Sequence, residues 1–566
     1  MRHPSLAILL FLLVVSAPPE LTRAAGGLAP PGLSDGGTPA LVVVLVVDQM
    51  RRDYIEDYGG AWKGGLRRLL DEGAWFTNAA YPYLTTLTCP GHATIATGSL
   101  PATHGIISNQ WWDRGSQQLI SCTDDPTSKE VPFGGNRPPG SGGSGRLLAV
   151  PTLASVLAGA KPTAGQVVAL SLKRASSAML SGIKGNSVIW RQGDGWSTST
   201  TYSSEPDRAT MKFLTANPIE HDFGAAWNRE GKKSEYKYDD NGLGEKPSVE
   251  WTAEFPHLLQ PRSGKPTTYF YEAWEESPYA DTYMGRLAAA LVDGLKLGKG
   301  QATDYLAVSF STLDIVGHDF GPRSHEIQDV LRRLDETLGD LIAQLDKKVG
   351  RDRYVLALSA DHGVATIPEQ LKAEGQDAGR VKMAEIMALV DTIVSKKFGK
   401  GRWVAIQAYS EFYFRAGVYD RITADPDLLA EVIRAIESQP GVHKVYDGRT
   451  LRGAEAAALD AVGVAAARSY FAERSGDLLI TLKPNWIFVS DDKTVIPGNA
   501  TTHGSSYPYD QRVPMVLFGA GVKPGRYEQE ATPADLAPTL ARLCRVPLPT
   551  ATGRVLEEAL SPSPSR

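Results

Sequence analysis

Continuous runs of apolar residues predict the strands of a buried sheet. These runs occupy residues 41–47, 305–311, 354–359 and 513–518. Strands that are covered on both faces have this pattern, whereas half-exposed strands alternate apolar and polar residues. Apolar residues with helical spacing occupy residues 61–72, 326–345 and 535–543. This succession of strands and helices predicts an α/β protein with a doubly wound, mostly parallel sheet flanked by helices.

Two segments interrupt the pattern. Residues 186–300 are rich in aromatic and polar side chains, and residues 369–476 combine helical spacing with a strand-like stretch at 411–415. We interpret both as insertions, because predicted strands occur before, between and after them. The first is expected to form a cap whose aromatic rings stack on an organic group of a substrate, or else a small separate core. The catalytic core is then divided into residues 41–185, 301–368 and 477–560.

The N-terminal residues have the features of a targeting segment. Arg2 and His3 precede an apolar run at residues 6–17, and a Gly- and Pro-rich stretch follows. The run is too short to cross a hydrocarbon core of about 30 Å, and it is typical of a signal peptide. We therefore predict a signal peptide at residues 1–25 and a linker at 26–40, with an uncleaved anchor as the alternative. The mature protein is expected to be periplasmic or secreted, with no stable membrane span.

Composition excludes several classes of protein. The chain has 566 residues, 42% of them apolar, and a net charge of -5 from 59 basic and 64 acidic side chains. This balance excludes intrinsic disorder and gives no sign of a nucleic acid partner. Length alone suggests three or four domains, but the predicted strands favour one sheet with two insertions. Three cysteines cannot form a disulfide framework; Cys122 with Cys544 is one candidate pair.

Carboxylates and imidazoles follow the predicted strands. Asp48 ends the first strand, and Asp314 and Asp361 follow two later ones. Histidines accompany them at His318, His362 and, far downstream, His503. Ligands of parallel sheets bind beyond the carboxyl ends of the strands, and oxygen and nitrogen atoms of these types hold zinc. Six such ligands divide into two three-ligand sites, and two metals close together clamp the attacking and leaving oxygens of a displacement.

A candidate nucleophile lies at the start of a predicted helix. Thr88 precedes Pro90, which suits the first turn of a helix. Backbone N–H groups at a helix N-terminus favour an anion such as phosphate, and metal coordination is one way to activate a hydroxyl. Asn109, further along the chain, is a candidate donor to a phosphoryl oxygen.

These motifs occur in an order that resembles the alkaline phosphatase superfamily. The similarity is greatest to periplasmic zinc alkaline phosphatases with a threonine nucleophile, which are relatives of the nucleotide pyrophosphatase/phosphodiesterases. The matching segments are residues 47–48, 86–92, 97–98, 104–109, 314–318, 361–363, 502–504, 533–539 and 553–554. They cover nearly all of the chain after the linker, so the resemblance implies the same fold and a two-zinc site.

The resemblance also implies a role for each matching residue. One zinc would take Asp314, His318 and His503. The second would take Asp48, Asp361 and His362, and would touch Thr88. Asn109 would bind the phosphoryl group together with backbone N–H groups that follow Thr88. His92 and His104 match motif positions that are not ligands, and they are expected to be structural.

One segment departs from the family pattern. Threonine-nucleophile monoesterases of this type carry Lys-x-Arg after the second strand, and both residues grip phosphoryl oxygens. Here Lys173 is in place, Ala175 occupies the arginine position, and Arg174 lies one residue early. In an extended segment Arg174 would point away from Lys173, unless a bulge turned it back. Lys173 and Arg174 are both retained as candidate phosphoryl-binding residues, and solvated surface charges are the alternative.

The expected activity is zinc-dependent hydrolysis of small-molecule phosphate monoesters through a phosphothreonine at Thr88. A phosphodiesterase or nucleotide pyrophosphatase on the same site is the main alternative, because the expected arginine is missing. A sulfatase is disfavoured, since Thr88 replaces the cysteine or serine that such enzymes convert. A non-catalytic binding protein is the third class, although all six candidate ligands are retained.

Overall fold

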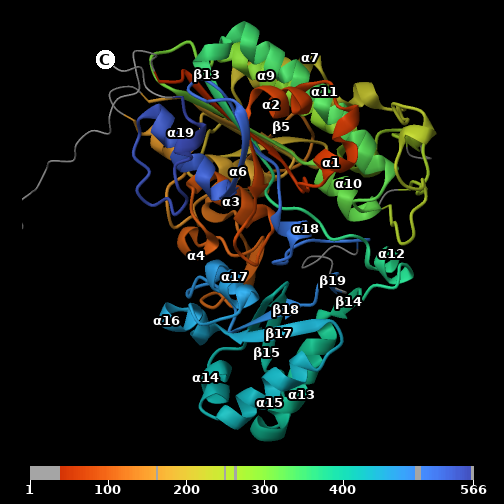
Figure 1. Cartoon of the computed structure of the whole chain (residues 1–566), viewed down its shortest axis with the longest axis vertical. Helices are drawn as coiled ribbons and strands as arrows, with labels where there is room; N and C mark the ends of the chain where they lie inside the picture. Colours follow the sequence, from red (N-terminus) through yellow and green to blue (C-terminus); the bar gives the residue numbers. More distant parts are fainter. Residues whose placement is uncertain (1–37, 161–163, 248–249, 261–263, 491–498, 562–566) are drawn as a thin grey trace, which may run out of the picture. The chain divides into compact units, whose positions relative to one another are not determined.

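An eleven-stranded sheet forms the centre of the structure (Figure 1). Its strands are β1 (Leu41–Val47), β2 (Ala74–Ala79), β5 (Asp124–Phe133), β6 (Ser141–Gly143), β7 (Val167–Ser171), β8 (Ser187–Gln192), β9 (Gly195–Ser199), β12 (Asp304–Phe310), β13 (Tyr354–Ser359), β20 (Met515–Gly519) and β21 (Gly525–Ala531). They lie in the order β21-β2-β20-β13-β1-β12-β7-β8-β9-β5-β6. The five central strands, β13 to β8, are parallel. The expected mostly parallel sheet is thus confirmed.

The computed structural model describes residues 38–160, 164–247, 250–260, 264–490 and 499–561. The predicted signal peptide and most of the predicted linker lie outside these residues. Among the helices within the described ranges, none has the length and apolar character needed to cross a bilayer.

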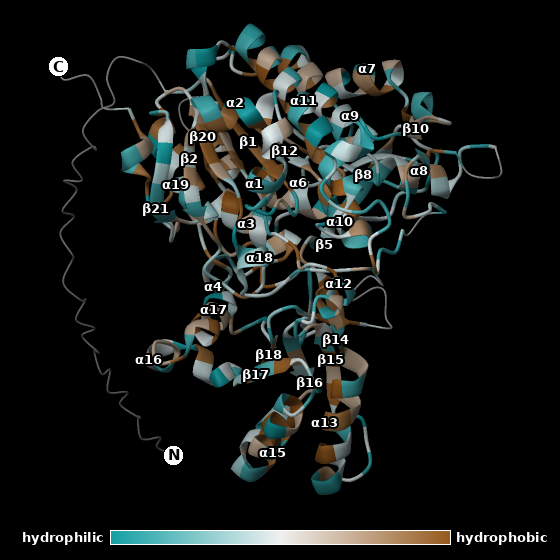
Figure 2. Cartoon of the chain, turned by 45° about the vertical axis from the view of Figure 1, so that its right-hand side comes forward, coloured by the Kyte–Doolittle hydropathy of each residue, from teal (hydrophilic) through white to brown (hydrophobic). Residues whose placement is uncertain are grey.

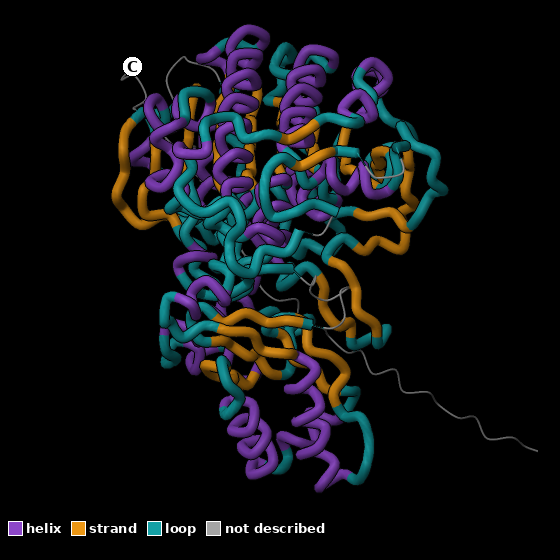
Figure 3. Tube along the Cα trace, turned by 90° about the vertical axis from the view of Figure 1, so that its right-hand side faces the viewer, coloured by secondary structure: helices purple, strands orange, loops and turns teal. Residues whose placement is uncertain are grey.

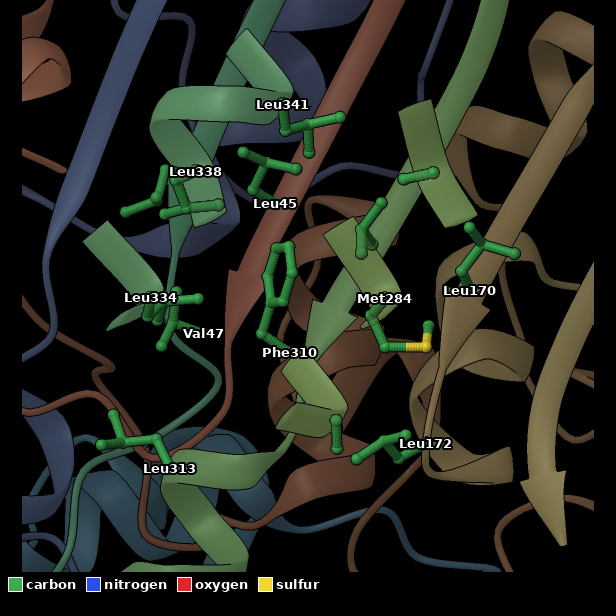
Figure 4. Packing of buried hydrophobic residues seen from close by; sticks show 14 of the residues in the cluster. Leu45, Val47, Leu170, Leu172, Met284, Phe310, Leu313, Leu334, Leu338 and Leu341 are labelled. Carbon is green, nitrogen blue, oxygen red and sulfur yellow. The ribbon is translucent and has the colours of Figure 1, made fainter. Parts of the chain in front are cut away.

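Helices cover both faces of the sheet, which explains why β1, β12 and β13 are buried along their whole length. One face packs against α2 (Gly65–Glu72), α9 (Pro278–Gly294) and α11 (His325–Lys348). On α11, Leu334, Leu338 and Leu341 repeat at helical spacing and face β1 (Figure 4). Helices α3 (Thr88–Thr97), α5 (Leu153–Ala158), α6 (Arg174–Ser181) and α19 (Leu536–Cys544) lie on the other side. Figure 2 shows the apolar residues of the helices and strands gathered between these layers.

The late apolar run differs from its neighbours in direction. It forms β20, which pairs antiparallel with both β13 and β2. Beyond it, β21 returns parallel to β2. The sheet is therefore mixed at its margins and parallel at its centre.

The aromatic-rich segment contributes to the main sheet and its core. β8 and β9 lie within residues 186–300 and extend the sheet, and α9 covers one face of it. Trp196, Trp227 and Trp274 are buried in the same core as the strands. For these rings the expected cap is wrong: they pack into the core because their own segment supplies strands and helices to it.

The second interrupting segment has a sheet of its own. β15 (Val404–Ala408), β16 (Glu411–Phe414), β18 (Leu478–Leu482) and β17 (Val442–Asp447) form an antiparallel sheet in the order β15-β16-β18-β17. Helices α13 (Met383–Phe398) and α15 (Pro426–Glu437) pack on it around Val390, Phe412 and Val432 (Figure 3). β18 lies beyond residue 476, so this sheet takes in more of the chain than the strand-like pattern predicts.

Smaller elements complete the described chain. The short strand pairs are β3 (Gln110–Asp113) with β4 (Gln118–Ser121), β10 (Ala226–Trp227) with β11 (His257–Leu258), and β14 (Gly379–Lys382) with β19 (Trp486–Val489). The remaining helices are α1 (Tyr54–Tyr58), α4 (Pro101–His104), α7 (Arg208–Ala216), α8 (Thr268–Glu275), α10 (Thr312–Phe320), α12 (Pro368–Ala373), α14 (Val418–Thr423), α16 (Gly453–Ala456), α17 (Ala461–Ser469) and α18 (Pro508–Gln511).

Candidate active site

Three carboxylates meet at the carboxyl ends of the central strands. Asp48 follows β1 directly, and Asp361 follows β13 after one residue. Asp314 lies in the first turn of α10, which begins where β12 ends. Because these strands are parallel, their carboxyl ends share one edge, and all three side chains are buried there.

Three imidazoles face these carboxylates in a fixed tautomer. The Nδ1 atoms of His318, His362 and His503 each lie 2.9 Å from a backbone carbonyl oxygen, those of Thr501, Gly363 and Thr86 respectively. A carbonyl oxygen only accepts hydrogen bonds, so each Nδ1 carries a proton, and in a neutral ring the lone pair is then on Nε2. Burial lowers the pKa of His362 and of His503, which keeps these rings neutral. This is the form in which histidine binds a metal.

The six predicted ligands form one cluster. Asp314, His318 and His503 offer ligand atoms that all lie within 4.8 Å of one another, and Asp48 does so with Asp314 and His362. His362 Nε2 lies 3.5 Å from Asp48 Oδ1 and 3.3 Å from Asp361 Oδ2. The structure thus brings together both sets of residues that the sequence separates into two sites.

The buried negative charge of the three carboxylates favours the binding of cations. Burial raises the pKa of Asp48 well above its usual value, and the charges of Asp314 and Asp361 raise it further. Asp48 Oδ1 is buried and accepts no hydrogen bond from any described residue. A buried, unpaired carboxylate oxygen is costly unless it binds a metal or a cation. Together with the free Nε2 atoms, these oxygens fit the preferences of a divalent metal ion.

Lys173 places its charge among the same carboxylates. It immediately precedes α6, and its Nζ donates to Asp48 Oδ2 at 2.7 Å and also to Asp314 Oδ2. Burial lowers the pKa of Lys173, but the attraction of Asp314 and Asp48 outweighs burial and raises it overall. The ammonium is therefore charged and faces the site.

Thr88 and Asn109 lie beside the cluster of carboxylates and imidazoles and line the same cavity. Thr88 is the first residue of α3, as its position before Pro90 predicts, and its Oγ1 lies 3.4 Å from His362 Nε2. Asn109 Oδ1 accepts the backbone N–H of Cys89 at 2.8 Å, and Asn109 lines the cavity. The Cys89 N–H was expected to bind phosphoryl oxygens, but this hydrogen bond occupies it.

A disulfide joins Cys89 to Cys122, with 6.5 Å between the Cα atoms. The suggested pairing of Cys122 with Cys544 is therefore wrong; Cys544 is a buried free thiol in α19. The β3–β4 hairpin returns the chain to Asn109, where the Cys122 N–H donates to the Asn109 carbonyl at 2.9 Å. Since Asn109 also binds Cys89, the hairpin brings the two sulfur atoms together. Three cysteines in sequence give no sign of this pairing.

A cavity of about 540 Å³ opens onto the cluster. Its lining includes Thr88, Asn109, Lys173, Arg174, Asp314, His318 and His503. Arg174 is the first residue of α6, so the expectation of an extended segment with alternating sides is wrong. Its Nη1 donates to the Ser141 carbonyl at 3.4 Å, while Lys173 reaches the carboxylates.

Two further residues lie at the site although the sequence patterns did not predict them there. Gln49 lies beside Asp48 with φ 68°, its backbone N–H donates to Asp361 Oδ1 at 3.1 Å, and its Nε2 donates to Asp314 Oδ1 at 2.6 Å. It thereby orients two carboxylates. Tyr409, with φ 52°, lies between β15 and β16 and lines the cavity with His503. Adjacency to Asp48 is a signal for Gln49, but no pattern points to Tyr409.

The two motif histidines have structural partners. His92 lies 2.8 Å from the Thr88 carbonyl through Nδ1 and 2.8 Å from Ser309 Oγ through Nε2. His104 Nδ1 accepts the N–H of Ile106 at 3.1 Å, and burial lowers its pKa to about 3. Both ring nitrogens of His92 are engaged, although its Nδ1 also lies 3.1 Å from Asp361, and His92, Asp48 and Asp361 offer polar atoms within 4.8 Å of one another.

Comparison with known proteins identifies the family. A family model described as Type I phosphodiesterase / nucleotide pyrophosphatase matches residues 42–506. A Myroides odoratus protein named calcium-transporting ATPase is 31% identical over 92% of this chain and 95% of its own length. Alkaline phosphatase PhoV of Synechococcus elongatus is 31% identical over 92% of this chain and 93% of its own length. The crystal structure of alkaline phosphatase PafA gives a TM-score of 0.82 at 29% identity, covering 93% of this chain and 99% of that one.

The family match spans most of the chain, and the relatives match it along nearly their full length. The chain therefore belongs to the type I phosphodiesterase/nucleotide pyrophosphatase family, within the alkaline phosphatase superfamily.

Proposed function

We propose that the protein is a zinc-dependent alkaline phosphatase that hydrolyses small phosphate monoesters through a phosphothreonine at Thr88. The observation that carries this proposal is the position of Thr88 Oγ1, 3.4 Å from His362 Nε2, at the edge of a cluster of three carboxylates and three imidazoles. The names of PhoV and PafA as alkaline phosphatases support the same activity.

Two zinc ions are the proposed cofactors. Asp314, His318 and His503 would hold one, and Asp48, Asp361 and His362 the other, with Thr88 beside the second. The donor set contains oxygen and imidazole nitrogen, and each imidazole presents Nε2. Bound zinc lowers the pKa of a coordinated hydroxyl or water and neutralises charge that develops on oxygen.

The residues divide the reaction into two displacements. Thr88 Oγ1, having lost its proton, attacks phosphorus in line with the ester bond, so that the Oγ1–phosphorus bond forms as the bond to the alcohol oxygen breaks, and the departing oxygen takes up a proton to leave as the alcohol. Water then attacks phosphorus from the opposite side, which releases inorganic phosphate and restores the Thr88 hydroxyl. The Nδ2–H group of Asn109 donates to a phosphoryl oxygen, and Lys173 supplies positive charge. Such catalysis depends mainly on positioning and electrostatic stabilisation.

The charge of Lys173 favours monoesters over diesters. A monoester brings one more negative charge to the site, and an ammonium in a buried site stabilises it strongly. Hydrolysis of diesters and pyrophosphates is the second candidate function. It is supported by the description of the matching family and by Ala175 at the expected arginine position. The ATPase name of one relative also describes cleavage of a phosphoanhydride.

A substrate panel with a nucleophile variant tests the proposal. The zinc-loaded protein is assayed at alkaline pH on phenyl phosphate, bis-phenyl phosphate and pyrophosphate. We expect phenyl phosphate to have the highest kcat/KM, and Thr88→Val to lower it by roughly 10³-fold or more. Mass spectrometry after acid quenching should detect a phosphoryl group on Thr88. Retained activity in Thr88→Val would refute the threonine mechanism.

Export from the cytoplasm is proposed on two grounds. The N-terminal residues have the pattern of a signal peptide. The Cys89–Cys122 disulfide forms and persists in oxidising compartments. N-terminal sequencing of the protein recovered from a periplasmic fraction tests the predicted export and the predicted cleavage of the signal peptide.

A further inference from the structure

We propose that Arg174 forms the centre of a second anion-binding subsite, which selects phosphate esters whose organic part carries a further phosphate or carboxylate. The inference rests on the proposed function, because the first subsite is the one that holds the transferred phosphoryl group. It assigns Arg174 to the remainder of the substrate instead of the reacting phosphorus.

The directions of two consecutive side chains carry the inference. Lys173 Nζ reaches Asp48 and Asp314 at the carboxylate cluster. Arg174 begins α6, and its Nη1 donates instead to the carbonyl of Ser141 in β6. Both side chains line the same cavity, together with Thr88 and Asn109. One cavity therefore presents two positive groups in two different places.

A glycine leaves the space through which the arginine side chain runs. A Cβ atom added at Gly143 would lie 2.8 Å from Arg174 Cδ, 3.1 Å from Arg174 Nε and 3.2 Å from the carbonyl oxygen of Thr123. Any side chain at residue 143 would displace the arginine. The bare backbone of β6 thus lets Arg174 lie against it and next to Thr123.

The guanidinium of Arg174 has N–H donors that are available to a ligand. Arginine carries five N–H donors, and the Ser141 carbonyl, at 3.4 Å, uses one of them weakly. Among the described residues, no carboxylate forms an ion pair with Arg174, whereas Lys173 has two such partners. A half-buried arginine without an acidic partner is suited to bind a carboxylate or phosphate with two parallel hydrogen bonds.

The surrounding wall is polar, and the carboxylate of Asp124 beside it accepts the backbone N–H of Ser121 at 3.1 Å. Ser121 and Thr123, with hydroxyl oxygens 3.3 Å apart, and Gln192 at the end of β8 line the cavity with Arg174. Asp314 is the one acidic residue in this lining, and Lys173 pairs with it. Among the described residues, Arg174 has no acidic ion-pair partner in this wall, so its guanidinium is available to an anion in the cavity.

The cavity has room for such a substrate. Its volume of about 540 Å³ lies within the range of about 300–1,000 Å³ that small-molecule sites usually have. A phosphoryl group at Thr88 fills only part of it. The ligand class is therefore a compact ester with two anionic groups, such as a bisphosphate or a phosphorylated carboxylic acid.

Two matched pairs of substrates test the subsite on the full-length, zinc-loaded protein. Glycerol phosphate and phosphoglycerate differ by a carboxylate, and fructose monophosphate and fructose bisphosphate differ by a phosphate. For each pair, kcat/KM for the substrate with the second anion is divided by kcat/KM for the substrate without it. This ratio is measured in the native protein, in Arg174→Gln and in Arg174→Lys. We expect Arg174→Gln to lower the ratio about tenfold, as for the loss of a hydrogen bond to a charged group, and Arg174→Lys to restore part of it.

The outcomes separate the subsite from other roles. An equal loss on both members of each pair would overturn the proposal, because it would place Arg174 on the transferred phosphoryl group. An unchanged ratio would overturn it as well. Arg526→Gln is the matched control, since Arg526 is 62% exposed and lies on β21 at the other margin of the sheet. If the native protein hydrolyses no member of either pair, the proposed phosphatase function fails, and not the subsite alone.

Discussion

At the scale of residues, Asp48, Asp314 and Asp361 are buried and held close together. Like charges in a buried site repel one another strongly, which is why the pKa of Asp48 is raised by burial and by its two neighbours. Lys173 offsets part of this repulsion, and it binds two of the three carboxylates. The same ammonium is the proposed determinant of monoester preference.

We predict that Lys173→Ala lowers kcat/KM for phenyl phosphate by about 10²-fold, because one charged donor to the phosphoryl group is lost. The loss on a diester should be at least several times smaller, since a diester carries one charge less. Steady-state kinetics on both substrates, with metal content measured for each sample, provide the check.

Lys184→Ala is the control for this comparison, because Lys184 is exposed just beyond α6. It should change neither rate. Equal losses on the two esters in Lys173→Ala would show that the lysine does not recognise the extra charge.

At the scale of elements, α3 approaches the end of β13 so closely that only glycine fits between them. A Cβ atom at Gly91 would lie 2.2 Å from the backbone oxygen of Asp361. This contact sets the distance between Thr88, one turn earlier on α3, and the ligands that follow β13. Backbone atoms cannot rotate away, so a larger residue would move the helix.

Gly91→Ala should therefore destabilise the protein by about 1–3 kcal/mol, the usual cost of overpacking. It should also lower kcat by about 10²-fold, because misplacing a reacting group by about 1 Å has an effect of that size. Denaturant unfolding and kcat measurements test the two effects.

Gly60→Ala serves as the matched substitution, since a Cβ atom at this exposed glycine meets nothing within 4 Å. Its stability and kcat should stay close to the native values. Native-like activity in Gly91→Ala would contradict the assigned contact.

The disulfide links two elements that carry the site. It joins the first turn of α3 to the residue that follows β4, across 33 positions of sequence. We predict that Cys89→Ala/Cys122→Ala loses about 4 kcal/mol of unfolding free energy, as expected for a loop of this length. The native protein with its disulfide reduced should behave similarly in chemical denaturation.

Cys544→Ala is the comparison, because Cys544 is a free thiol in α19. The unfolding free energy that Cys544→Ala loses should be less than half of the amount lost by the double variant. The disulfide assignment fails if reduction leaves the unfolding free energy of the native protein unchanged.

At the scale of the whole molecule, the site joins distant parts of the chain. β1, β12 and β13 deliver carboxylates, α3 delivers Thr88, and the segment after β19 delivers His503. Ions bound here would therefore stabilise the whole fold, since a ligand that binds the native state alone raises its stability.

Removal of metal by a chelator should abolish activity and lower Tm. With free zinc at about 1,000 times its Kd, binding adds about 4 kcal/mol to the free energy of unfolding, so the shift should amount to several degrees. Differential scanning fluorimetry with and without added zinc measures it, and elemental analysis counts the ions. A Tm that zinc does not change would argue against metal binding by this cluster.

Local patterns predicted four strands of the main sheet, β1, β12, β13 and β20, and the carboxylates that follow three of them. Residues 41–47 and 354–359 coincide with β1 and β13, because a strand buried on both faces needs an unbroken apolar run. Strand ends are then visible in sequence, and so are the carboxylates that follow them. Parallel strands have their carboxyl ends at one edge of the sheet. Asp48, Asp314 and Asp361 were therefore expected to lie close to one another.

Other features depend on contacts between distant residues, which sequence patterns do not encode. The pairing of Cys89 with Cys122 follows from a hairpin that brings Cys122 back to Asn109. The place of Arg174 depends on the start of α6 and on the space left by Gly143. The sequence by itself determined the buried central strands and the carboxylates and imidazoles that follow them, since both depend on local order along the chain. Only the tertiary structure decided the disulfide, the burial of the aromatic segment and the direction of Arg174, because each depends on which surfaces pack together.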